Sequence, residues 1–142
     1  MSLKNLLLLG LTLLFWGSAP LFEKIGLRGA SPLVALTVRT TLASLLLLSA
    51  CLLLGKTQAL FSLTLRDYVA LGGSGLIAGV VGMFTYFSLL KAGEASKIVP
   101  LTAAYPLVTA LLSLVILGEK LSPLRLLGIF FTILGLIILQ RS

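Results

Sequence analysis

Residues 5–27 read NLLLLGLTLLFWGSAPLFEKIGL, a stretch with no charged side chain before Glu23. A helix needs about 20 predominantly apolar residues to cross the hydrocarbon core of a bilayer, so this stretch predicts a transmembrane helix. Further apolar stretches follow at residues 33–54, 67–90, 98–117 and 122–140. We therefore expect an all-α membrane protein with five transmembrane helices, in a single domain over residues 1–142.

The composition of the chain also indicates a membrane protein. Of its 142 residues, 58% are hydrophobic and only 11% are charged, whereas a soluble domain has about 25% charged residues. We expect a multi-pass protein of the cytoplasmic (inner) membrane, surrounded by the lipid bilayer. The net charge of +7 comes from lysines and arginines scattered at the predicted helix ends, so we expect no nucleic-acid partner.

The residue types on which many active sites depend are scarce. The chain has one cysteine, Cys51, and no histidine. This excludes an internal disulfide, a zinc site of the usual Cys/His type and a His-dependent catalytic triad. No nucleophile, base and orienting group converge by their spacing. We predict that the protein is not an enzyme and uses neither a metal nor another cofactor.

The lysines and arginines at the helix ends bear on orientation, because cytoplasmic loops normally carry an excess of these residues. Here the two sides are balanced. Side one, where the chain begins, holds Lys4, Lys56, Arg66, Lys120 and Arg125, and side two holds Lys24, Arg28, Lys91, Lys97 and Arg141, while Arg39 is left over inside the second span. We predict that the chain inserts in both orientations and pairs as an antiparallel homodimer. A fixed orientation set by the first helix is the alternative.

Glycines are spaced for close helix packing in two spans. They are Gly72, Gly75, Gly79 and Gly82 in the third span and, more weakly, Gly128 and Gly135 in the fifth. Glycines four residues apart on a helix let a second backbone approach closely. We interpret them as packing positions, with direct ligand contact as the alternative.

Hydroxyl groups follow one face of two predicted helices. The spacing places Thr37, Thr40, Thr41 and Ser44 on one face of the second span, and Thr102, Tyr105, Thr109 and Ser113 along a similar stripe of the fourth. Two such stripes suggest a shared cavity, or else hydroxyls that bond back to carbonyls of their own helix. The candidate cavity residues are Trp16, Ser18, Thr37, Arg39, Thr41, Tyr86, Thr102, Tyr105 and Thr109.

Two prolines lie inside predicted spans. Pro20 and Pro106 each remove a backbone hydrogen bond, which frees the carbonyls of Trp16 and Thr102 and bends the helix. We interpret both prolines as hinge candidates, although kinked helices also occur in rigid bundles.

Arg39 is a charged residue within the second span. It lies about seven residues from the start of the span, which is about 10 Å at 1.5 Å per residue. Such a charge is expected to face the protein interior, to pair or to extend to the interface. Glu23, near the end of the first span, is the natural partner for a structural ion pair. Alternatively, Arg39, with Lys24 nearby, offers positive charge to an anionic substrate group.

Several of these residues form a recognisable pattern. They are Phe15-Trp16-Gly17-Ser18, Ser31-Pro32-Leu33 followed by Arg39, Tyr105-Pro106-Leu107, and Leu117-Gly118-Glu119-Lys120-Leu121-Ser122-Pro123. Over essentially its whole length the chain resembles the EamA family of the drug/metabolite transporter superfamily. The Gly-Glu-Lys connection before the last span is the most specific part of this pattern.

The resemblance implies a function. Most family members carry two five-span units in one chain, with inverted halves around a central substrate cavity, and many export amino acids or other small metabolites. This chain has one unit, so the resemblance implies a dimer, and an antiparallel pair would reproduce the inverted repeats. We expect an exporter or exchanger of small polar or amphipathic metabolites that works by alternating access. A non-transporting membrane subunit or scaffold for a different protein is the alternative.

Overall fold

The computed structural model describes residues 2–119 and 122–141, and in these residues all regular structure is helical. Lys120 and Leu121, which belong to the Gly-Glu-Lys connection, lie outside the described residues. Five helical spans are long and apolar enough to cross a membrane: Leu3–Gly29, Pro32–Leu53, Leu65–Ala92, Ala95–Ile116 and Pro123–Arg141. The predicted all-α membrane protein with five spans is confirmed.

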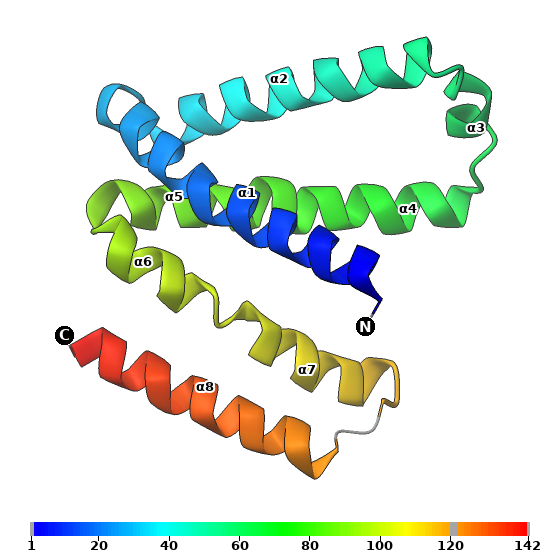
Figure 1. Cartoon of the computed structure of the whole chain (residues 1–142). Helices are drawn as coiled ribbons and strands as arrows, with labels where there is room; N and C mark the ends of the chain where they lie inside the picture. Colours follow the sequence, from blue (N-terminus) through cyan, green and yellow to red (C-terminus); the bar gives the residue numbers. More distant parts are fainter. Residues whose placement is uncertain (1, 120–121, 142) are drawn as a thin grey trace. The chain divides into compact units, whose positions relative to one another are not determined.

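The chain divides into two compact units, Met1–Ala92 (unit 1) and Gly93–Ser142 (unit 2). Unit 1 consists of α1 (Leu3–Gly29), α2 (Pro32–Leu53), the short α3 (Thr57–Phe61), α4 (Leu65–Ser74), the π-helical segment η1 (Gly75–Gly82) and α5 (Met83–Ala92). The segments α4, η1 and α5 follow one another and form the third span (Figure 1). Unit 2 consists of α6 (Ala95–Thr102), α7 (Tyr105–Ile116) and α8 (Pro123–Arg141).

Short polar motifs begin the helices of unit 1. The Ser31 hydroxyl accepts a hydrogen bond from the backbone N–H of Val34 at 3.4 Å, and Pro32 occupies the first turn of α2, where its missing N–H costs nothing. At the start of α4, Thr64 and Asp67 each accept from the other's backbone N–H, at 3.3 and 3.0 Å. This capping box fixes the beginning of the third span.

A glycine ends α2. Gly55 has a φ of 65°, and its N–H donates to the Leu52 carbonyl at 3.1 Å, while the N–H of Lys56 donates to the Cys51 carbonyl at 2.8 Å. This Schellman arrangement satisfies carbonyls that the helix leaves without a partner. It requires the left-handed backbone conformation that glycine adopts most easily. Gly118, also at a φ of 65°, follows α7, and there the N–H of Glu119 donates to the Ser113 carbonyl at 3.2 Å.

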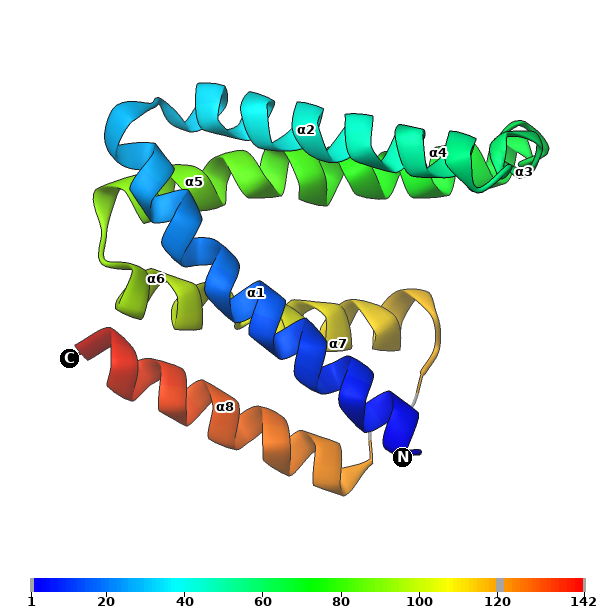
Figure 2. The same cartoon turned by 45° about the horizontal axis from the view of Figure 1, so that its top comes forward.

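The core of unit 1 lies where α1 ends, α2 begins and α5 ends. Both α1 and α2 pack against α5, and they contact each other. The buried side chains there are Leu27, Leu36, Phe87 and Leu90, all at most 4% exposed. Toward its N-terminus α1 diverges from α2 and from the third span (Figure 2). The outward surfaces carry large apolar side chains, as expected of helices that face lipid.

Two lysines tie these helix ends together. The Lys24 ammonium, on α1, donates to the carbonyls of Leu90 and Lys91 at the end of α5, at 2.6 and 3.3 Å. The Lys91 ammonium donates in return to the Ala30 carbonyl, just after α1, at 2.7 Å. The last carbonyls of a helix lack intrahelical partners and attract positive charge. Each lysine therefore caps the helix to which the other belongs, and we call this arrangement the lysine clamp.

The predicted hinge prolines have different surroundings. Pro20 lies inside α1, which continues through it, and is buried. Pro106 lies inside the span Ala95–Ile116, as expected, and the helix of that span is interrupted next to it, because α6 ends at Thr102 and α7 begins at Tyr105. Pro106 has no N–H to donate to the Thr102 carbonyl, and it therefore occupies the first turn of a new helix. Whether either proline acts as a hinge stays a prediction.

The glycines of the third span lie in or beside the π-helical segment Gly75–Gly82. A stripe inferred from 3.6 residues per turn does not persist through a π-helix, so the predicted seam is interrupted there. A Cβ added at Gly82 would lie 3.3 Å from the Ile77 carbonyl oxygen, whereas one at Gly75 or Gly79 would meet nothing within 4 Å. No other described residue therefore occupies the space into which a side chain at these two positions would extend, and their packing role stays a prediction.

Candidate functional site

Unit 1 brings one acidic, one basic and two aromatic side chains together from three helices. The Nε atom of Arg39, on α2, lies 3.4 Å from a carboxylate oxygen of Glu23, on α1. The guanidinium carbon lies 6.0 Å from the ring centroid of Phe87, on α5. The adjacent Tyr86 lies close enough to Glu23 for its hydroxyl to interact with the carboxylate. We call Glu23, Arg39, Tyr86 and Phe87 the Arg39 cluster.

The cluster compensates for charge within the spanning helices. Glu23 is only 12% exposed, whereas Arg39 is 49% exposed. The carboxylate has an opposite charge beside it, and the cation also has the face of an aromatic ring. Because Phe87 is itself 1% exposed, its ring is held in place by the core. The arrangement therefore restricts the guanidinium to one position.

A cavity of about 470 Å³ opens beside the cluster. It is lined by Ala19, Phe22, Glu23, Gly26, Ala30, Val34, Ala35, Val38, Arg39 and Phe87. A mostly apolar lining with a few polar groups, at this volume, is typical of sites for small molecules. The spacing of Glu23 and Arg39 from the helix ends had indicated the pair, but it could not indicate that Phe22 and Phe87 flank them.

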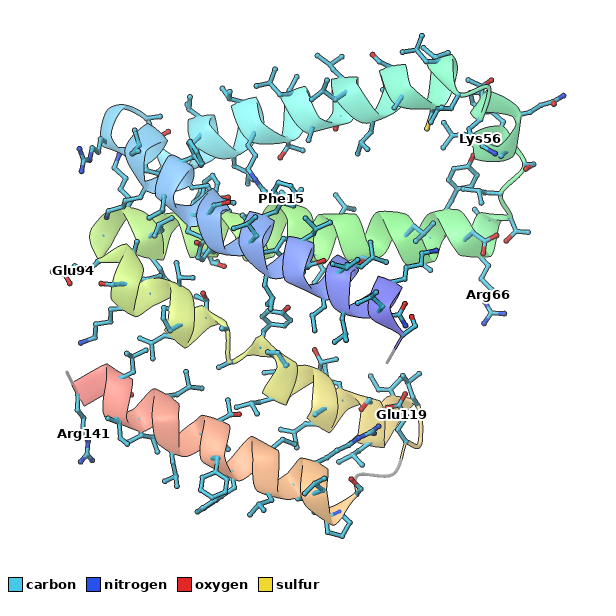
Figure 3. All side chains as sticks on the ribbon, viewed as in Figure 1. Phe15, Lys56, Arg66, Glu94, Glu119 and Arg141 are labelled. Carbon is cyan, nitrogen blue, oxygen red and sulfur yellow. The ribbon has the colours of Figure 1, made fainter. Side chains whose placement is uncertain are left out.

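Unit 2 has a cavity of its own between α7 and α8, with a volume of about 770 Å³. Its polar lining residues are Tyr105, Thr109, Ser113, Glu119, Arg125 and Thr132, and Pro106 and Gly128 also line it. Figure 3 shows Glu119 at the turn that follows α7. The prediction included Tyr105 and Thr109 but omitted Ser113 and Thr132, although both continue hydroxyl patterns along their helices.

The remaining candidate residues do not line either cavity. They are Trp16, Ser18, Thr37, Thr41 and Thr102, and Tyr86 of the Arg39 cluster is likewise absent from both linings. Most of the predicted hydroxyls bond back to their own helix, from Ser18 to Phe15, from Thr37 to Leu33, from Thr102 to Val99 and from Thr109 to Tyr105, at 2.9 to 3.3 Å. This is the alternative that the sequence had left open. Lys24, expected near Arg39, instead has its ammonium in the lysine clamp.

Comparisons with known proteins agree with this fold. The model of the EamA-like transporter family matches residues 3–141. A protein named "uncharacterized transporter in cobO 3'region", from a Sinorhizobium species, is 28% identical over 118 residues, which are 83% of each chain. An uncharacterized protein of Methanocaldococcus jannaschii is 35% identical over 69 residues, 49% of this chain and 50% of that protein. No solved structure gives a significant match.

The family match runs through all five spans, including both the Arg39 cluster and the cavity of unit 2. A match of this extent covers the whole membrane-embedded part of the chain rather than one shared motif. The chain therefore belongs to the EamA-like transporter family and is a multi-pass membrane transporter.

Proposed function

We propose that this protein is an antiparallel, dual-topology homodimer of the cytoplasmic membrane that exports or exchanges small polar or amphipathic metabolites by alternating access. The observation that carries the proposal is the equal number of lysines and arginines at the helix ends of the two sides, with Arg39 inside the second span counted on neither side. Balanced charges favour neither orientation. Two oppositely oriented copies make the inverted pair around which many transporters are built.

The charges at the helix ends of unit 1 support this proposal. Lys24, Arg28 and Lys91 lie at the end where α1 and α5 finish, and the lysine clamp joins that end. Lys56 and Arg66 lie on either side of α3, at the opposite end of α2 (Figure 3). The alternation of basic residues assumed in the charge comparison therefore agrees with the packing of unit 1.

The length of the Sinorhizobium relative also supports a single-unit transporter. Because its 118 aligned residues are 83% of both chains, the two proteins are about equally long. A protein named a transporter thus has about the size of one five-span unit, and an inverted second half would come from a second chain.

Interruptions in two spans support alternating access. The fourth span breaks between Thr102 and Tyr105, and the third contains the π-helical segment Gly75–Gly82. Broken helices are common near the substrate sites of transporters, and π-helical turns occur often at functional sites. At both places the regular α-helical hydrogen bonding is already interrupted. A helix can therefore change direction there without losing further hydrogen bonds of this kind.

Reporter fusions at the C-terminus test the orientation. One reporter is active only in the cytoplasm and the other only outside it, and we expect activity from both. Lys56→Gln and Arg28→Gln remove one charge from side one and from side two, so they should shift the ratio of the two activities in opposite directions. Activity from a single reporter that neither variant changes would contradict dual topology and would require an oppositely oriented partner protein.

The single cysteine tests the arrangement of the dimer. Cys51 lies about 8 residues from the midpoint of α2 (Pro32–Leu53), which is about 13 Å along the helix. In an antiparallel dimer the two Cys51 residues would therefore differ in depth by about 25 Å, too far for a disulfide, which needs Cα atoms within about 7 Å. Oxidation should give no disulfide-linked dimer. A linked dimer formed through Cys51 would show parallel copies.

A further inference from the structure

Arg39 has more hydrogen-bond donors than its partners among the described residues use. A guanidinium group carries five N–H donors. In the part of the chain that the structure describes, the polar partner of this side chain is the Glu23 carboxylate, reached through Nε, and its other neighbour is the ring of Phe87. The terminal nitrogens of Arg39 therefore have no hydrogen-bond acceptor among the described residues.

At the position of Arg39, leaving these N–H donors without an acceptor is unfavourable in free energy. The residue lies within a spanning helix, about 10 Å from the helix start, where the hydrocarbon supplies no acceptors. Its side chain is 49% exposed and lines the 470 Å³ cavity. A half-exposed guanidinium in such a place needs an acceptor that residues 2–119 and 122–141 do not provide.

The surroundings hold the guanidinium in a defined orientation. Glu23 is only 12% exposed, and its carboxylate lies 3.4 Å from the Nε atom, so it is a fixed partner on the Nε side. Phe87, 1% exposed, lies against the group. A planar guanidinium held in this way offers two parallel N–H donors to the two oxygens of a carboxylate or phosphate.

We infer that Arg39 binds the oxyanion group, a carboxylate or a phosphate, of a small organic anion with an apolar body. The inference rests on the proposed function and names the class of molecule that is transported. The apolar lining by Phe22, Val34 and Val38 accommodates the body of such a molecule, and the cavity volume is in the range for small ligands. Glu23 acts as a positioning residue, and its negative charge limits how tightly an anion binds.

A lipid headgroup carries the same chemistry, because its phosphate could also reach Arg39 along the membrane interface. The experiment therefore compares a soluble anion with a lipid. Benzoate is the probe, since it combines a carboxylate with an apolar ring, and benzamide is the matched uncharged control. The full chain is purified in an uncharged maltoside detergent.

The first measurement is the reactivity of arginines toward phenylglyoxal, followed for each arginine by mass spectrometry of peptides. Benzoate should slow the modification of Arg39 and leave that of Arg28 unchanged, because Arg28 lies outside the cavity lining. Benzamide should have no effect. Equal protection by benzamide would show an apolar pocket that does not recognise charge, and the absence of protection by benzoate would overturn the inference outright.

The second measurement is the rise in Tm that benzoate causes, from which its affinity is obtained. Arg39→Gln should lower the affinity about tenfold or more, since hydrogen bonds to a charged group are lost. Arg39→Lys keeps the charge but not the planar pair of donors and should give an intermediate value. If neither variant folds, the modification experiment on the unaltered protein still decides the question.

Added phosphatidylglycerol distinguishes the two sources of the oxyanion. If the lipid protects Arg39 and benzoate does not, the site holds a headgroup and the inference about a transported anion is wrong. Neither measurement depends on orientation or on transport. Failure of benzoate binding with both reporters active therefore overturns this inference alone, whereas a single active reporter with benzoate binding intact overturns only the proposed dimer.

Discussion

Replacement of Lys24 by methionine should destabilise the packing of α1 against α5. Methionine keeps most of the length and apolar surface of the side chain but removes the ammonium group. The carbonyls of Leu90 and Lys91 would lose the donor that now lies at 2.6 and 3.3 Å. Both carbonyls belong to the last turn of α5, where no later N–H of the helix can replace the lost donor.

The expected magnitude follows from these contacts. A hydrogen bond from a charged donor contributes about 1.5–3 kcal/mol, and a cation at a helix C-terminus contributes about 0.3–1 kcal/mol. Because the Lys24 contact is only partly buried, we expect a loss of about 2 kcal/mol, which is about a thirtyfold change in the unfolding equilibrium. The Lys91 bond to Ala30 is exposed, so Lys91→Met should cost less, about 1 kcal/mol.

The assay is reversible unfolding in maltoside micelles by increasing amounts of dodecyl sulfate, followed by circular dichroism. Lys56→Met is the matched control, since the Lys56 ammonium makes no hydrogen bond within residues 2–119 and 122–141. Lys24→Arg should retain most of the stability because it keeps a charged donor. Equal stability of Lys24→Met and the control would refute the lysine clamp as a stabilising contact.

Three further predictions concern the core, one turn and the cavity. Phe87→Ala should lower the free energy of unfolding by about 3 kcal/mol, because the ring is 1% exposed. Phe131→Ala, at a 62% exposed position, should lower it by less than about 1 kcal/mol. Equal losses for the two variants would contradict the described core. Gly55→Ala places a side chain on a residue with a φ of 65° and should lower the free energy of unfolding by about 1 kcal/mol. Gly10→Ala, in a helix where the added Cβ meets nothing within 4 Å, should leave the stability unchanged or raise it. Thermal unfolding measures both effects. Glu23→Gln removes a negative charge from the cavity and should strengthen benzoate binding roughly tenfold in the Tm titration, whereas unchanged or weaker binding would remove the electrostatic argument.

The pairing of Arg39 with Glu23 illustrates how far sequence reasoning reaches in a membrane protein. The depth of both residues could be estimated from the helix ends, because a helix rises by a constant amount per residue. A charge in hydrocarbon needs a partner, and few acidic residues were available at the same depth. The ring of Phe87 beneath the guanidinium was not predictable, since it depends on how α2 and α5 face each other.

The glycines and prolines lie in segments whose local structure could not be predicted from the sequence. Their spacing was interpreted on an ideal α-helix, but the third span contains a π-helical segment and the fourth span breaks before Tyr105. Local hydrogen bonding decided both outcomes, through the missing N–H of Pro106 and the change in residues per turn at Gly75–Gly82. The hydroxyl stripes were similarly ambiguous, because a threonine can bond to its own helix or line a cavity at the same spacing.

The sequence by itself determined that the chain is helical, crosses the membrane five times and carries balanced charges at the helix ends, because these properties depend on local composition and on the thickness of the bilayer. Only the tertiary structure decided that Lys24 and Lys91 cap each other's helices and that Arg39 lies half-exposed between Glu23 and Phe87 at the wall of an apolar cavity. The physical reason is that a helix satisfies its own backbone, so its sequence specifies the element but not the direction in which it meets its neighbours.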